Sequence, residues 1–100
     1  MELISVIIPA HNEEERVGNV IDKLRQTKSN IEIIVVDNCS TDNTSNIALE
    51  KKAILAHCDN RGKGYAMEKG LQYAKGNIIV FVDGDLEIFI DDLITMMVTP

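Results

Sequence analysis

Two aspartates, Asp83 and Asp85, follow an apolar run and are separated by one glycine, in the segment IIVFVDGDLE at residues 78–87. Carboxylates at this spacing supply hard oxygen ligands, which suit Mg²⁺ or Mn²⁺. The pair cannot enclose such a cation, so water and the phosphates of a substrate would complete its coordination. Gly84 removes a side chain where the backbone must bend and a ligand must approach. The motif therefore predicts a divalent cation that is shared with a phosphate.

The same residues allow a simpler interpretation as the turn of a β-hairpin. An Asp-Gly pair between apolar segments is a strong turn signal, and LEIFI beyond it could form the second strand. An EF-hand loop is excluded, because Ile88 occupies the position that requires glycine. The rest of the chain must decide between a turn and a metal site.

Arg61 and Lys63, in the segment NRGKG, are natural counter-charges for a phosphate just before a predicted helix. The segment is not a P-loop, because Gly64 stands where Ser or Thr should follow the lysine. It is not a dinucleotide fingerprint, because Met67 occupies the third glycine position. By itself the segment is equally well explained as a solvated basic turn.

Other polar residues have ordinary structural explanations when each is taken alone. Asp37 ends the apolar run IEIIVVD and could be a turn residue or a ligand contact. Glu13 and its two following glutamates favour the first turn of a helix, where they would meet the helix dipole. His11 and His57 are interpreted as structural residues.

Apolar runs alternate with segments of helical periodicity along the whole chain. Strands are predicted at residues 3–8, 31–37, 53–58 and 77–82, the first being stopped by Pro9. Helices are predicted from 13 to about 28, after a cap at Thr41 or Asp42, from 64 to 74, and after a cap at Asp91 or Asp92. In the third helix Ala66, Met67, Gly70, Leu71 and Ala74 are expected on the packed face, with Gly76 as its C-cap.

This alternation predicts an α/β fold with a parallel sheet. Continuous apolar runs fit strands that are covered on both faces. The C-terminal ends of parallel strands lie at one edge, where open α/β folds bind ligands. Polar segments follow every predicted strand: PAHNEEE, DNCSTD, DNRGKG and DGDLE. Their convergence favours a binding site over an isolated turn.

Composition limits the class of protein. One hundred residues, 45% of them hydrophobic, form one small domain that spans residues 1–100. The net charge of −6 argues against a nucleic-acid partner. The start of the chain lacks the features of a signal peptide, and no apolar run reaches bilayer length. Cys39 and Cys58 are expected to be free thiols in a reducing cytosol, so a cytoplasmic location is predicted.

The ordered segments SVIIPAHNEE, IIVVDNCSTDNT, NRGKGYAMEKGL and GNIIVFVDGDLE resemble the N-terminal half of family 2 inverting glycosyltransferases of the GT-A fold. The third segment is most similar to the polyprenyl-phosphate hexosyltransferase branch. The resemblance covers nearly the whole chain. It implies a three-layer α/β/α half-domain that binds a UDP- or GDP-sugar with Mn²⁺ or Mg²⁺, for inverting transfer of a hexose to an acceptor such as a polyprenyl phosphate. Longer relatives of this kind would work at the cytoplasmic face of a membrane.

The resemblance also implies roles for single residues. Pro9, Ala10 and Glu13 would border the nucleotide, and Asp37 would bond to the base. Lys63 would lie near the diphosphate. In the DxD motif, Asp83 would lie near the ribose and the metal, Gly84 would allow close approach, and Asp85 would coordinate the cation.

The chain departs from the family pattern in two respects. Asn38-Cys39 replaces the common aspartate-glycine pair, although Asn38 can still make polar contacts. The acceptor site and the general base of the family lie past DxD, so no catalytic base is expected within these residues. The alternative is a non-catalytic nucleotide- or metal-binding module that acts with a partner. A half-domain would expose a sheet edge, which predicts a homodimer.

Overall fold

The computed structural model describes residues 2–82, in which strands and helices alternate along the chain. The elements are β1 (Ile4–Ala10), α1 (Val17–Arg25), β2 (Ile31–Asn38), α2 (Thr44–Glu50), β3 (Ile54–Cys58), α3 (Lys63–Tyr73) and β4 (Ile78–Phe81). The strands form a four-stranded sheet in the order β3-β2-β1-β4, and each neighbouring pair is parallel. The predicted α/β fold with a parallel sheet is confirmed. The predicted last helix and the possible hairpin strand after Asp83 lie outside the described residues.

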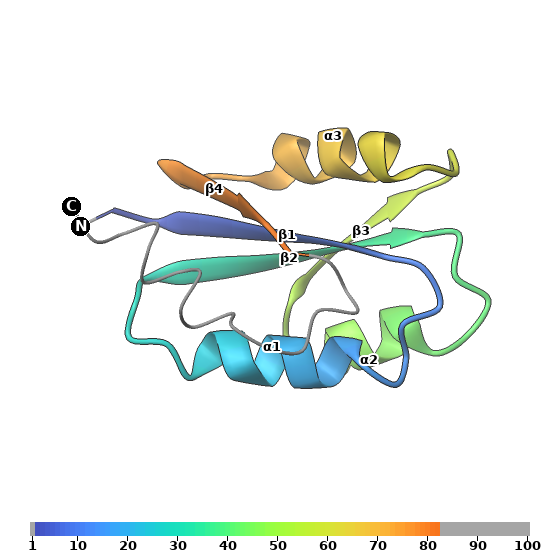
Figure 1. Ribbon diagram of the computed structural model, residues 1–100, viewed down its shortest axis with the longest axis horizontal. Coiled ribbons are helices and arrows are strands. Elements are labelled where there is room, and N and C mark those ends of the chain that lie inside the picture. The colour runs from blue at the N-terminus through green and yellow to red at the C-terminus, as the bar shows by residue number, and fades with distance from the viewer. Residues whose placement is uncertain (1, 83–100) are drawn as a thin grey trace.

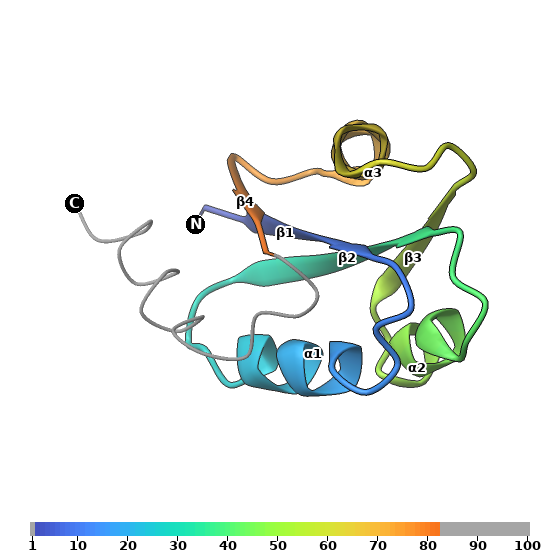
Figure 2. The same ribbon diagram turned by 45° about the vertical axis from the view of Figure 1, so that its right-hand side comes forward.

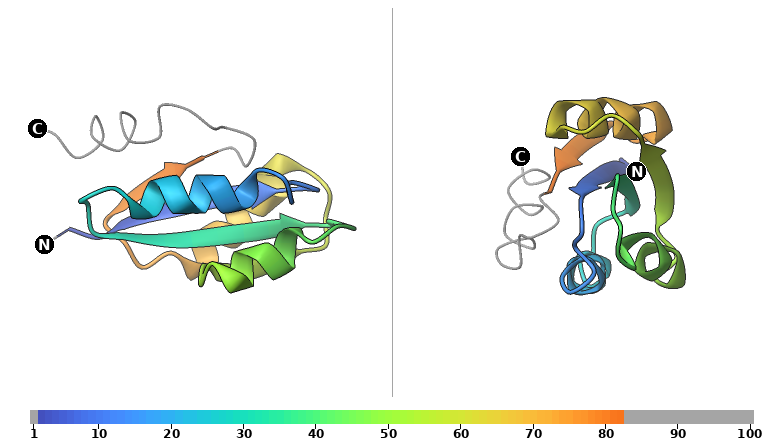
Figure 3. Two further views of the ribbon diagram at one scale, coloured as in Figure 1. Left: turned by 90° about the horizontal axis from the view of Figure 1, so that it is seen from below. Right: turned by 90° about the vertical axis from the view of Figure 1, so that its right-hand side faces the viewer.

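Helices cover both faces of the sheet, as Figure 1 shows, with α3 on one face and α1 and α2 on the other. The turned view of Figure 2 and the end-on view in Figure 3 show the same three layers, and α1 and α2 lie side by side when seen from below. Every residue of β1 is buried, because this strand lies inside the sheet and is covered on both faces. This burial explains its continuous apolar run. No helix within residues 2–82 has both the length and the apolar character needed to cross a membrane.

The larger part of the core lies between the sheet and α1. The predicted apolar stripe of this helix is confirmed, since Val17, Val20, Ile21 and Leu24 are all buried. The helix is shorter than predicted, because it begins at Val17 and the three glutamates precede it. A turn leads into the helix, in which the Val17 amide donates to the Glu13 carbonyl at 2.8 Å.

The other face of the sheet is covered by a strip of small residues on α3. A Cβ added to Gly70 would lie 2.4 Å from Cγ2 of Ile7 and 3.2 Å from Cγ2 of Val36, so the helix backbone lies very close to the sheet. Ala66 is the other buried residue of this helix. The prediction for Leu71 was wrong, since its side chain is 47% exposed. The strip of α3 that packs on the sheet contains Ala66 and Gly70 but not Leu71. Each step along a helix turns the side chain by about 100°, so Leu71 points well away from the direction of Gly70.

Pro9 does not stop the first strand, contrary to expectation, and β1 continues to Ala10. The Ile7 carbonyl accepts from the Val82 amide at 2.9 Å, so alternate residues of β1, Pro9 included, direct their backbone groups toward β4. The described pairing of β1 with β4 ends at Ile7 and Phe81. Within residues 2–82, Pro9 therefore lies past the last β1 residue that pairs with β4.

Gly76 is not a helix cap, because α3 ends at Tyr73 and its C-cap residue, Ala74, has an extended conformation. A Cβ at Gly76 would lie 2.5 Å from the Leu3 carbonyl oxygen and 2.6 Å from Oγ of Ser5. Glycine is required here because the chain passes directly against β1 before it enters β4. The cap of α2 also differs slightly from the prediction. Its N-cap position is Asn43, although the carboxylate of Asp42 accepts from the Thr44 amide at 3.0 Å.

Candidate functional site

The C-terminal ends of the strands meet at one edge of the sheet. Ala10 pairs with Asp37, and Asp37 pairs in turn with His57, so the ends of these three strands lie level to within one residue. The loops after β1 and β2 and the start of α3 gather at this edge, on the right of Figure 1. The predicted convergence of the first three polar segments is therefore confirmed. The fourth begins at Asp83 and lies outside the described residues.

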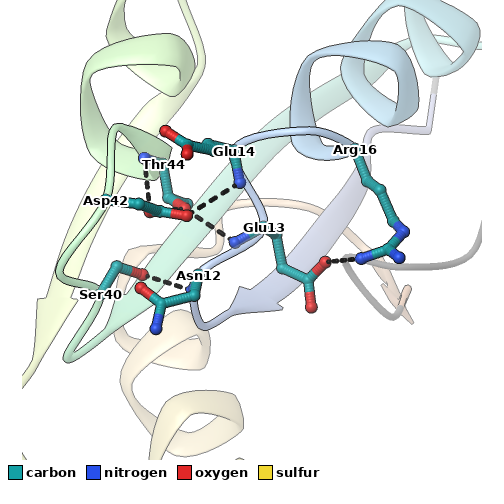
Figure 4. A network of polar contacts seen from close by, with 7 residues as sticks. All are labelled: Asn12, Glu13, Glu14, Arg16, Ser40, Asp42 and Thr44. Atoms are coloured by element: carbon teal, nitrogen blue, oxygen red, sulfur yellow. Dashed lines mark hydrogen bonds and ion pairs between the residues drawn. The ribbon is translucent and has the colours of Figure 1, made fainter.

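The β1–α1 loop and the β2–α2 loop are joined by reciprocal hydrogen bonds (Figure 4). The Asn12 amide donates to Oγ of Ser40 at 2.9 Å, and the Asn12 side-chain Oδ1 accepts from the Thr41 amide at 2.8 Å. The Glu13 amide donates to Oγ1 of Thr44 at 2.9 Å. These bonds satisfy backbone groups that the strands and helices leave unpaired, and they hold Glu13 in place.

Asp42 supports the same junction from the β2–α2 side. Its carboxylate accepts from the amide of Thr44 and, at 3.3 Å, from the amide of Glu14. Burial by itself would raise the pKa of Asp42, but hydrogen bonds from Thr44 and Glu14 outweigh it and hold the pKa below its usual value. A charged carboxylate at this position therefore stabilises the junction at neutral pH.

Asp37 is occupied by its own loop. Its carboxylate accepts from the Ser40 amide at 3.0 Å and from the hydroxyl of Ser45 at the start of α2. Burial would raise the pKa of Asp37, but the bonds from Ser40 and Ser45 and the nearby His57 lower it below its usual value overall. These contacts give Asp37 a structural role in the turn after β2. Its predicted bond to a base stays a prediction.

A polar hollow of about 130 Å³ lies between the end of β1 and the start of α3. It brings together four residues that the resemblance assigned to the nucleotide or its diphosphate: Pro9, Ala10, Glu13 and Lys63. Its other lining residues are His11, Asn38, Arg61 and Gly62. Arg61 and Lys63 provide positive charge at a helix start, and this combination suits a phosphate.

Asn38, for which the sequence predicted only unspecified polar contacts, is a further functional candidate. Its Nδ2 donates to the Gly62 carbonyl at 2.8 Å, and Gly62 has a φ of 131°, which favours glycine. Among residues 2–82, Asn38 Oδ1 is the buried side-chain oxygen or nitrogen that has no hydrogen-bond partner. An unpaired buried acceptor is costly, and Asn38 is also one of the residues that line the polar hollow. The feature of the sequence that could have indicated Asn38 was its position, directly at the end of a buried strand.

An apolar hollow of about 270 Å³ adjoins the polar one. It is lined by Pro9, Lys63, Met67, Phe81 and Val82, so the two hollows share Pro9 and Lys63. Asp83, Gly84 and Asp85 follow Val82 directly in the sequence but lie outside the described residues. Within residues 2–82 there is no group of three His, Cys, Asp or Glu side chains that could hold a metal ion. The predicted metal ligands therefore stay a prediction.

A third hollow of about 380 Å³, the outer hollow, lies between β3 and α3. Its lining residues include His57, Asp59, Tyr65, Glu68 and Lys69. It is larger than the polar hollow, but it contains none of the residues that the sequence assigned to a site. The polar hollow is therefore the candidate functional site.

The chain is similar in sequence to a known protein family and to proteins of named activity. The model of the family described as Glycosyl transferase family 2 matches residues 5–100. The 4,4'-diaponeurosporenoate glycosyltransferase of Staphylococcus haemolyticus is 40% identical over 92 residues, which cover 85% of this chain and 24% of that protein. The dolichyl-phosphate beta-glucosyltransferase of Drosophila melanogaster is 36% identical over 99 residues, which cover 82% of this chain and 30% of that protein.

Solved structures show the same similarity. The UDP complex of glucosyl-3-phosphoglycerate synthase from Mycobacterium tuberculosis aligns with a TM-score of 0.83 at 32% identity, over 99% of this chain and 41% of that one. A second structure of that enzyme, with a TM-score of 0.81 and 30% identity, contains Mn²⁺, UDP and glucosyl-3-phosphoglycerate. The chain thus spans less than half the length of each relative described here.

Proposed function

Because this chain belongs to glycosyl transferase family 2, we propose that its polar hollow binds the nucleoside diphosphate of a sugar donor. The observation that carries the proposal is the gathering of Pro9, Ala10, Glu13 and Lys63 around one hollow at the ligand edge of the sheet. The UDP bound to a structural relative supports this choice of ligand.

We assign the base contact to Asn38. Its Oδ1 is an acceptor without a partner in the described part of the chain. Uracil and guanine both present ring N–H donors that could supply the missing bond. Asp37 is the less favourable candidate, because both of its carboxylate oxygens already accept hydrogen bonds.

The diphosphate would lie toward Lys63 and Arg61. Both side chains line the polar hollow, where their charge would offset that of the phosphates. Lys63 also lines the apolar hollow next to Val82, the residue that precedes the DxD motif. Placing the phosphates near Lys63 therefore brings them toward the end of β4.

Asp83 and Asp85 would hold the divalent cation. Their donor set fits Mn²⁺ or Mg²⁺, because two carboxylates leave coordination positions for phosphate oxygens and water. A bound cation supplies a Lewis acid that stabilises charge on the departing nucleoside diphosphate. The Mn²⁺ and UDP in a structural relative support this assignment.

For the whole reaction we propose inverting transfer of a hexose to a polyprenyl phosphate. The name of the Drosophila relative, a dolichyl-phosphate glucosyltransferase, supports this acceptor class. The family's general base is expected past the DxD motif. This chain's described residues are therefore assigned to donor binding.

Calorimetric titration tests donor binding directly. We expect UDP or GDP to bind in the presence of Mn²⁺, and Lys63→Met to weaken that binding about tenfold through loss of a charged contact. Lys69→Met is the matched control, because Lys69 is on the same helix but lines the outer hollow. Equal losses in both variants, or absence of binding to the unaltered chain, would contradict the proposed function.

A further inference from the structure

His11 lies in the polar hollow and makes a specific contact through each ring nitrogen. Its Nδ1 is 2.7 Å from the backbone carbonyl oxygen of Asn38. A carbonyl oxygen can only accept a hydrogen bond, so Nδ1 carries a proton. This contact joins the loop after β1 to the end of β2 and holds the plane of the imidazole ring.

The other ring nitrogen faces two donors. Nε2 lies 3.1 Å from Nη1 of Arg61 and 3.4 Å from the side-chain Nδ2 of Asn12. The orientation of the Asn12 amide is fixed independently, because its Oδ1 accepts from the Thr41 amide. A guanidinium has no acceptor, so Nε2 must present its lone pair. The tautomer of His11 that carries its proton on Nδ1 therefore fits both contacts.

We propose that His11 is a positioning residue that holds the guanidinium of Arg61 in the polar hollow as a second cation for the donor diphosphate, beside Lys63. Arg61 is exposed and its side chain has many rotamers, so without a partner the guanidinium would sample many positions. The bond to Nε2 selects one direction for it. Preorganised charge binds an anion more tightly than charge that must be ordered on binding.

Histidine suits this position because the two contacts differ in kind. One side of the ring must donate to the Asn38 carbonyl and the other must accept from Arg61. Asparagine can reproduce only the first contact, since its amide ends near the position of Nδ1. Glutamine is longer, and its amide oxygen can reach the position of Nε2. The variants His11→Asn and His11→Gln therefore distinguish the effect of losing the Arg61 contact from the effect of losing the contact with the Asn38 carbonyl.

The inference rests on the proposed function, because it concerns the same hollow, and two measurements distinguish them. The first is the tautomer of His11, observed through the ¹⁵N shifts of its ring nitrogens in the chain without nucleotide. We expect the Nδ1–H form. An Nε2–H form would overturn the role of His11 whatever the nucleotide affinity.

The second measurement compares UDP with uridine by calorimetry in Mn²⁺. His11→Asn and Arg61→Met should each weaken UDP binding about fivefold to tenfold and change the affinity for uridine by less than about twofold. His11→Gln should retain UDP affinity within about twofold. The double variant His11→Asn with Arg61→Met should be no weaker than Arg61→Met alone, because both changes remove one interaction.

Several results of these titrations would overturn the proposal. Equal loss of UDP and uridine in His11→Asn would show that the residue only shapes the pocket. Additive losses in the double variant would show that His11 and Arg61 act separately, and so would unchanged UDP affinity in His11→Asn. Absence of any nucleotide binding by the unaltered chain would contradict the proposed function, and with it the role of Arg61 toward a diphosphate.

Discussion

The side chain of Asn38 donates through Nδ2 to the carbonyl oxygen of Gly62 at 2.8 Å, which ties the end of β2 to the start of α3. This bond uses one N–H of the side-chain amide, and the acceptor of the amide, Oδ1, has no partner among the described residues. The same residue supplies the backbone carbonyl that accepts from His11. Asn38 thus connects three segments around the polar hollow and retains one unused acceptor for a ligand.

Asn38→Ala should weaken uridine and UDP alike, because both carry the base. We expect a loss of about fivefold to tenfold, as for one hydrogen bond to a neutral group. Asn60→Ala is the control, since Asn60 is exposed and lines the outer hollow. Calorimetry measures both ligands. A loss confined to UDP would place Asn38 at the phosphates instead.

Gly70→Ala should destabilise the fold. The new Cβ would meet Ile7 at 2.4 Å, so α3 must move away from the sheet, at a cost of about 1–3 kcal/mol in the free energy of unfolding. Gly64→Ala is the matched change in the same helix, because no atom lies within 4 Å of its added Cβ. It should stabilise by up to about 1 kcal/mol through helix propensity. Urea unfolding of both variants would test the close contact, and equal effects would refute it.

Thr44→Val should weaken the junction between the two loops. The hydroxyl of Thr44 accepts from the Glu13 amide and donates to Asp42, and valine has the same shape without this hydroxyl. Because Thr44 is buried, its replacement by valine leaves the Glu13 amide without a partner, which costs about 1–3 kcal/mol in the free energy of unfolding. Thr41→Val, at an exposed position, should cost much less. Thermal unfolding distinguishes the two variants, and amide hydrogen exchange at Glu13 should become faster in Thr44→Val.

Asp37 should contribute stability that is lost in acid. Its pKa in the folded chain is below the usual 3.8, so the unfolded chain binds a proton more readily. The contribution is therefore complete above about pH 4 and falls as the pH drops through the folded pKa. Asp37→Asn should cost about 1–3 kcal/mol at pH 7 and flatten the stability profile below pH 4. Asp59→Asn, at an exposed position, is the control, and an unchanged acid profile in Asp37→Asn would contradict the assignment.

Removal of the cation should weaken the binding of a nucleoside diphosphate and leave the binding of a nucleoside unchanged. We expect EDTA to weaken UDP and leave uridine unchanged. Asp85→Ala should do the same, by at least about tenfold, which is the usual scale for disturbing a metal site. Asp85→Asn keeps the size of the side chain and removes its charge, so it should behave like Asp85→Ala. Full UDP affinity in the presence of chelator would exclude a metal-dependent site.

The order of elements and the ligand edge of the sheet could be predicted from local patterns in the sequence. Continuous apolar segments such as IIVV, within the β-branched run IEIIVVD, indicate strands covered on both faces, and the alternation with helices then predicts a parallel sheet. Parallel strands place their polar ends together, and the resemblance to family 2 glycosyltransferases then assigned Pro9, Ala10, Glu13 and Lys63 to one site at that edge. These features depend on periodicity and chain direction, both of which the sequence contains.

Other features depend on distances between segments far apart in the chain, so only the tertiary structure could decide them. The exposure of Leu71 follows from how closely α3 approaches Ile7, and Gly76 is explained by a contact with Leu3 across 73 positions of sequence. The unpaired oxygen of Asn38 and the tautomer of His11 depend on which donors and acceptors surround each atom. A hydrogen bond has a range of about 3 Å, and no local pattern specifies which distant groups come within it.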